Sequence, residues 1–116
     1  MNLSSQARNN FEKEITLEEG WDNADLIVEY LKLLEVDYVF GVPGGAIEPL
    51  YNALSRRKEN NDPIIIVARH EAGAAFMAEG YARETGKLGV CCATTGPGST
   101  NLLTGVASAY ADNVAM

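Results

Sequence analysis

Apolar residues follow helical spacing in four parts of the chain. After Asp22, which can serve as an N-cap, they recur at intervals of three and four residues, at Leu26, Ile27, Tyr30, Leu31 and Leu34. A second helix is predicted from Ile47, and its Pro49 fits only in a first turn. Two further helices are predicted to start at Glu71 and Ser99.

Three short apolar runs between these helices predict strands, at residues 38–40, 64–67 and 88–94. The β-branched run 64–67 is typical of a strand that is buried on both faces. Strands that alternate with helices over such short intervals indicate a parallel sheet with right-handed crossovers.

The predicted fold class is therefore α/β: a three-layer, flavodoxin-like parallel sheet with helices on both faces, incomplete at the C-terminus. The 116 residues suffice for one small domain, which we place at residues 21–116. Residues 1–20 lack periodicity and are rich in Glu, so we expect a disordered or loosely attached lead-in.

Three loops follow the predicted strands and should meet at one edge of the sheet, where open parallel sheets bind ligands. They are residues 41–45, 69–71 and 94–98. Gly and Pro in two of these loops can also serve only to reverse the chain. Neither loop matches a dinucleotide-binding or Walker A pattern, so phosphate binding is weakly supported.

Glu71 is the strongest candidate for chemistry. It follows a predicted strand directly and begins a helix rich in Ala and Gly residues. A carboxyl group sheltered there should have a raised pKa and be able to share a proton with a weak base. The alternative interpretation is that Glu71 only complements the helix dipole. His70, taken alone, is better explained as structural.

Charge and composition narrow the classes of partner. Sixteen acidic residues against nine basic ones give a net charge of −7, which disfavours nucleic acid and anionic lipid. No apolar stretch approaches the roughly 20 residues of a membrane helix, and residues 1–20 do not resemble a secretion signal. We therefore expect a cytoplasmic protein.

Cysteines and histidine do not suggest a metal site built from this chain alone. Cys91 and Cys92 are adjacent in a predicted strand, so their side chains should point to opposite faces. His70 is the single histidine, which leaves too few ligands for zinc.

Small and apolar residues dominate the last two predicted helices. Glycines within the Glu71 helix indicate that another element approaches it closely. Residues 88–116 carry one charged side chain, that of Asp112, so a helix there would expose apolar surface on every side if the chain were alone. We therefore expect a partner, and a homo-oligomer is the simplest one.

Four motifs carry a resemblance to a known family. In order, they are residues 40–46 (FGVPGGA), 70–75 (HEAGAA), 79–83 (EGYAR) and 94–101 (TTGPGSTN). Together they resemble the start of a thiamine diphosphate-dependent enzyme, most similar to the acetolactate synthase (acetohydroxyacid synthase) type.

This resemblance implies a pyrimidine-binding domain, truncated here, at residues 21–116. The matching catalytic carboxylate is Glu71, which in the family hydrogen-bonds the pyrimidine ring and favours its imino tautomer. The resemblance also implies that Pro43, Gly44, Pro97 and Asn101 line or border the cofactor pocket. The substrate would be a 2-keto acid, which is decarboxylated and joined to a second one.

The family binds the diphosphate and Mg2+ through a Gly-Asp-Gly motif in another domain, and this tripeptide does not occur here. We therefore expect a fragment that is inactive in isolation, with Mg2+ bound by the missing diphosphate-binding domain. Three alternatives remain: a subunit of a split thiamine diphosphate decarboxylase, a non-catalytic interaction domain, and a plain flavodoxin-like binding module.

Overall fold

The computed structural model describes residues 19–56 and 61–116. The predicted lead-in therefore lies almost entirely outside the described residues. The described elements are α2 (Asn23–Leu33), β1 (Tyr38–Gly41), the short 3-10 helix η1 (Gly45–Ile47), α3 (Glu48–Arg56), β2 (Ile64–Val67), α4 (Glu71–Thr85), β3 (Val90–Cys92) and α5 (Pro97–Ala111).

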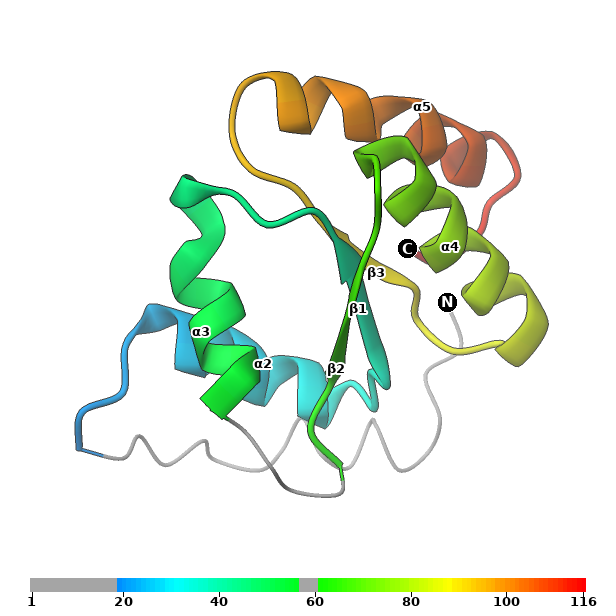
Figure 1. The fold of residues 1–116 in the computed structure, drawn as a ribbon. Coiled ribbons are helices and arrows are strands. Elements are labelled where there is room, and N and C mark those ends of the chain that lie inside the picture. Colours follow the sequence, from blue (N-terminus) through cyan, green and yellow to red (C-terminus); the bar gives the residue numbers. More distant parts are fainter. Residues whose placement is uncertain (1–18, 57–60) are drawn as a thin grey trace.

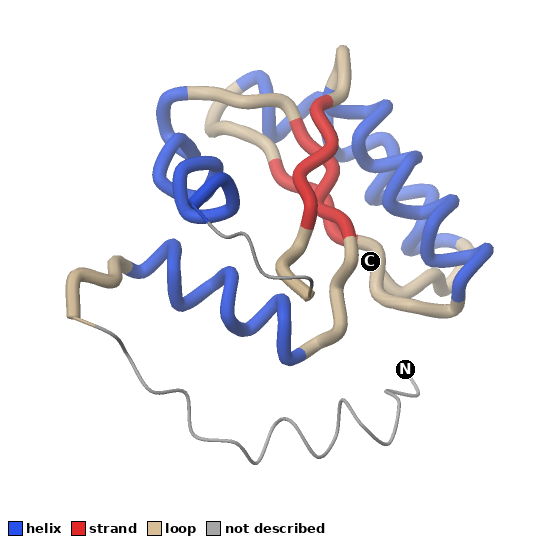
Figure 2. The backbone as a smooth tube through the Cα atoms, turned by 60° about the horizontal axis from the view of Figure 1, so that its bottom comes forward, coloured by secondary structure: helices blue, strands red, loops and turns tan. Residues whose placement is uncertain are grey.

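The strands form one parallel sheet in the order β2-β1-β3. Tyr38 of β1 aligns with Ile64 of β2, and Val39 aligns with Val90 of β3. Helices α2 and α3 cover one face of the sheet, and α4 and α5 cover the other (Figures 1 and 2). The predicted three-layer, flavodoxin-like class is confirmed.

Two apolar clusters hold the layers together, one on each face of the sheet. Val39 points toward α2 and α3, where it is fully buried with Val28 and Ala53. The next residue, Phe40, points the other way and packs on Ala74 and Ala78 of α4. This alternation follows from the two-residue period of a strand.

The first predicted helix is confirmed, and its start has a clear cause. Asp22 accepts hydrogen bonds from the backbone N–H groups of Ala24 at 2.8 Å and Asp25 at 3.1 Å. Asp25 in turn accepts from the backbone N–H of Asp22 at 3.1 Å. This reciprocal capping box satisfies donors that the first turn of a helix leaves free.

One prediction about the sheet is wrong. The run 64–67 forms β2, but β2 lies at the edge of the sheet rather than buried on both faces. Ile64 is 56% exposed and Val67 is 61% exposed. The β-branched residues favour a strand at either position, so the pattern did not reveal which strand is central.

Candidate functional site

The loops that follow β1 and β3 meet at the carboxyl edge of the sheet, as predicted from the order of the elements. A Cβ atom built on Gly44 would lie 2.5 Å from Cβ of Thr94. One built on Gly98 would lie 2.9 Å from Cγ2 of Thr94 and 3.3 Å from Oε1 of Glu71. Thr94 therefore packs against both glycines, and Gly98 also lies close to the Glu71 carboxylate.

Glu71 begins α4 directly after the loop that follows β2. The N-cap is His70, whose Nδ1 accepts a hydrogen bond from the backbone N–H of Ala72 at 3.1 Å. This contact gives His70 the structural role expected of it. The Glu71 side chain turns toward α5, where Nδ2 of Asn101 donates to its Oε2 at 3.1 Å.

The pKa of Glu71 differs in direction from the prediction. The sequence predicts a raised value, but hydrogen bonds from its own backbone N–H and from Asn101 hold the pKa below the ordinary value. Desolvation, which raises a carboxyl pKa, is weaker than either hydrogen bond, and the charge interaction with His70 lowers the pKa by a smaller amount. Glu71 in the described chain is therefore an ionised hydrogen-bond acceptor at neutral pH.

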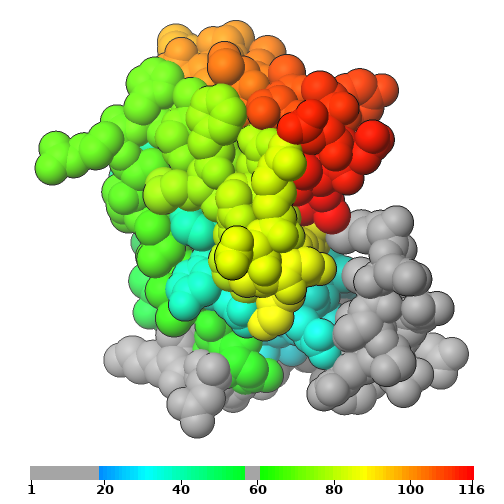
Figure 3. Space-filling view, turned by 90° about the vertical axis from the view of Figure 1, so that its right-hand side faces the viewer, coloured from blue at the N-terminus to red at the C-terminus, as the bar shows by residue number. Residues whose placement is uncertain are grey.

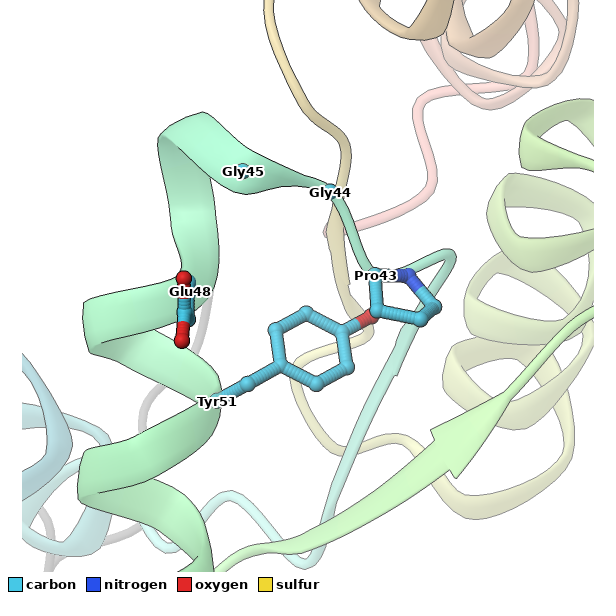
Figure 4. Close-up of a pocket in the computed structure, with 5 residues that line it drawn as sticks. All are labelled: Pro43, Gly44, Gly45, Glu48 and Tyr51. Carbon is cyan, nitrogen blue, oxygen red and sulfur yellow. The ribbon is translucent and has the colours of Figure 1, made fainter.

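A cavity of about 290 Å³ lies beside these loops, on the α3 side of the sheet. Its lining residues are Pro43, Gly44, Gly45, Glu48 and Tyr51. In Figure 4 the Tyr51 ring extends from α3 toward Pro43. Glu71 does not line this cavity. Gly44 lies between the two regions, because it lines the cavity and also packs against Thr94.

The predicted site residues are thus brought together in part. Glu71 and Asn101 are in direct contact, and Gly44 is connected to them through Thr94 and Gly98. Pro97 is exposed in the first turn of α5. The cofactor-binding roles of Pro43, Gly44, Pro97 and Asn101 stay predictions.

Sequence reasoning missed two residues of this region. Thr94 was part of a recognised motif, but its central position among the loops depends on tertiary contacts. Tyr51 belongs to the predicted helix after Ile47, whose apolar spacing carries no sign of a site; its hydroxyl lies 3.9 Å from Sγ of Cys92. Burial, with a contribution from Cys92, raises the Tyr51 pKa, so the hydroxyl is protonated at neutral pH.

Residues 19–56 and 61–116 offer neither a metal-binding cluster nor a membrane-spanning helix. No group of three or more His, Cys, Asp or Glu side chains there could hold a metal ion. Among the same residues, no helix has both the length and the apolar character to cross a membrane.

Comparisons with known proteins identify a family. Residues 22–116 match the model described as "Thiamine pyrophosphate enzyme, N-terminal TPP binding domain". The chain is 47% identical over 102 residues to the acetolactate synthase large subunit of Lactococcus lactis, a match covering 88% of this chain and 17% of that protein. It is 50% identical over 93 residues to the acetolactate synthase isozyme 2 large subunit of Escherichia coli, covering 80% and 16%.

A plant relative shows the same relation. The chain is 47% identical over 91 residues to the chloroplastic acetolactate synthase of Arabidopsis thaliana, a match covering 78% of this chain and 13% of that protein. The chain therefore spans between about an eighth and a sixth of the length of these relatives.

Proposed function

Since this chain belongs to the family of N-terminal thiamine pyrophosphate-binding domains, we propose that it forms the pyrimidine-binding part of an acetolactate synthase-like enzyme. The observation that carries the proposal is the position of Glu71. Its carboxylate lies at the carboxyl edge of a parallel sheet, held by Asn101 and next to the glycine loops that follow β1 and β3.

The residues present fit a flat heteroaromatic ring. Gly44 and Gly98 bring backbone close to Thr94 and Glu71, where no Cβ would fit without displacement. Pro43, Gly44 and Tyr51 add a largely apolar wall nearby. A hydrogen-bond acceptor next to glycine and apolar surface is what an aminopyrimidine edge requires.

When bound, thiamine diphosphate supplies the acidic carbon and the electron sink needed to decarboxylate a 2-keto acid. In this proposal Glu71 holds a proton at a pyrimidine nitrogen, and Asn101 orients the carboxylate. Pro43, Gly44 and Pro97 border the ring and exclude water.

The low pKa of Glu71 in the single chain is compatible with this role. The group has few neighbours to desolvate it here, and hydrogen bonds dominate its pKa. A ring and a covering subunit would remove water from the carboxylate, and such desolvation raises a carboxyl pKa. We therefore expect the pKa of Glu71 to rise when the complete site assembles.

We further propose that the complete enzyme is a cytoplasmic homo-oligomer that acts on a 2-keto acid. Exposed apolar side chains on α4 and α5 support a partner, namely Phe76, Met77, Leu103 and Tyr110. Mg2+ and the diphosphate would be bound outside this chain, which is expected to be inactive alone.

A domain exchange tests the proposal. Residues 22–116 would replace the matching segment of the Lactococcus lactis large subunit, and acetolactate formation from pyruvate would be measured with thiamine diphosphate and Mg2+. We expect activity in the chimera and a loss of about 10² to 10⁴-fold in kcat for Glu71→Gln, as is typical when a group that handles a proton is removed.

The matched control is Glu84→Gln, which removes an exposed carboxylate near the other end of α4. It should leave kcat unchanged. A folded, cofactor-binding chimera in which Glu71→Gln retains full activity would contradict the proposed role.

The exposed apolar surface also supports a second candidate, a non-catalytic interaction domain. Calorimetry separates the two functions. An interaction domain would bind its protein partner with the same affinity in the presence and absence of thiamine diphosphate. A pyrimidine-binding domain mixed with its partner domains should instead bind the cofactor itself with measurable heat.

A further inference from the structure

Helices α4 and α5 lie side by side and contact each other at regular intervals. Figure 3 shows α5 and the C-terminal residues, in orange and red, against the yellow-green surface of α4. Four contacts follow one another along the pair: Glu71 with Asn101, Ala75 with Gly105, Glu79 with Ser108, and Arg83 with Asp112. We call this series the ladder.

The spacing of the ladder shows that it fixes a register. Its members on α4 are four residues apart, and those on α5 are three or four residues apart, so each set lies along one face of its helix. The first contact contains the candidate catalytic carboxylate. The other three contain no residue predicted to bind the cofactor.

At Gly105 the two helices leave no room for a side chain. Gly105 is buried, and a Cβ atom built on it would overlap the Ala75 side chain. The same atom would lie 3.2 Å from the carbonyl carbon of Ala75 and 3.2 Å from the amide nitrogen of Phe76. Backbone atoms cannot yield as a flexible side chain can, so any larger residue would move α5 away from α4.

The two polar contacts beyond Gly105 fix the far end of the pair. Glu79 is only 5% exposed, and its Oε1 accepts from Ser108 at 3.3 Å and from Arg83 at 2.7 Å. Arg83 also pairs with Asp112 at the end of α5. Removing such partners from a buried carboxylate lowers the stability of the fold. These contacts therefore oppose sliding of α5 along α4.

We propose that Gly105 is a positioning residue: by allowing α5 to approach Ala75, it holds the Asn101 amide against the Glu71 carboxylate. The hydrogen bond from Asn101 is 3.1 Å long. A displacement of α5 by about 1 Å would take it beyond the distance at which such bonds form. This inference rests on the proposed function, since it assigns Gly105 a role toward the same carboxylate.

The test is a titration of the Glu71 carboxyl group, followed by carbon-13 NMR in the full chain. Asn101→Ala calibrates the effect, because it removes the donor and should raise the Glu71 pKa. Gly105→Ala should raise the pKa by the same amount. Gly80→Ala is the matched control, since a Cβ atom there meets nothing within 4 Å, and it should not change the pKa.

Rescue separates positioning from general loss of structure. In the double variant Ala75→Gly/Gly105→Ala, the worst overlap is removed, and the Glu71 pKa should return most of the way to its original value. If Gly105→Ala alone does not fold, this double variant decides: it must fold and show the low pKa.

Two outcomes would overturn the inference. One is a folded Gly105→Ala variant with an unchanged Glu71 pKa in a chain where Asn101→Ala raises it. The other is a double variant that does not fold or keeps the raised pKa. Because the titration needs no cofactor, it can succeed or fail independently of the proposed role of Glu71 in catalysis.

Discussion

At the scale of single residues, the pKa of Glu71 depends on what surrounds the carboxylate. In the described chain it is half-buried and bonded to Asn101, so hydrogen bonding outweighs desolvation. The sequence shows the Ala and Gly neighbours that suggest shelter, but it does not show that Asn101, thirty positions later, supplies a donor. The sign of the pKa shift was therefore outside the reach of sequence reasoning.

Replacing Asn101 with Ala should change the pH dependence of stability. A carboxyl group with a lowered folded pKa stabilises the fold above its unfolded pKa, and this contribution is lost as the pH falls through the folded pKa. Because the variant loses a donor, its unfolding midpoint in urea should fall at neutral pH and differ less from the original chain in acid.

Thr104→Ala is the control for this prediction, since it alters an exposed residue one turn further along α5. Its unfolding midpoint should follow that of the original chain at every pH. An Asn101→Ala chain that is destabilised equally in acid and at neutral pH would show that its bond to Glu71 does not depend on charge.

At the scale of elements, the described α-helices and strands could be predicted from the sequence, but the 3-10 helix η1 and some boundaries could not. The predicted strand 88–94 is shorter, at Val90–Cys92. Gly89 instead donates to the carbonyl of Ala115 at 3.1 Å, and Thr94 leaves the sheet to contact Gly44. These contacts join parts of the chain that are distant in sequence, and the spacing of apolar residues cannot predict them.

Helix α5 begins at Pro97 rather than at the predicted Ser99. Pro fits the first turn of a helix because its missing N–H would have no partner there. The preceding Gly96 adopts a positive φ of 71°, which lets the chain turn sharply from the β3 loop into the helix.

Two adjacent glycines between β1 and α3 should respond differently to the same substitution. Gly44→Ala places a methyl group 2.5 Å from Cβ of Thr94, whereas Gly45→Ala meets nothing within 4 Å. We expect Gly44→Ala to lower the free energy of unfolding by about 1 to 3 kcal/mol, as overpacking does. Gly45→Ala should be neutral or stabilise by up to about 1 kcal/mol.

Urea unfolding of both variants measures this difference directly. Equal stabilities for the two variants would mean that the β1 and β3 loops are not in close contact, and the described site would then lose its connection between Gly44 and Glu71.

At the scale of the whole molecule, the sheet separates two apolar layers, and each layer contains one cysteine. Cys92 packs with the α2 and α3 layer, and Cys91 packs with the α4 layer. The prediction that these side chains point to opposite faces is confirmed. Burial raises the pKa of Cys91 to about 11 and also raises that of Cys92.

Both thiols should therefore report on folding. At about pH 8.5, the pKa of an unperturbed cysteine, iodoacetamide should modify the folded chain much more slowly than the urea-unfolded chain, because the thiolate is the reactive form. Mass spectrometry would assign the rate to each cysteine. Modification of one thiol at the unfolded rate would mean that its layer is open in solution.

Action of the Glu71 carboxylate on a pyrimidine ring, as proposed here, can be measured through proton exchange at the cofactor. Deuterium exchange at C2 of thiamine diphosphate would be followed by proton NMR in the Lactococcus lactis chimera. Exchange should be slower by about 10² to 10⁴-fold in Glu71→Gln and unchanged in Glu84→Gln. Equal exchange rates in Glu71→Gln and the unsubstituted chimera, with cofactor bound to both, would contradict this action of Glu71.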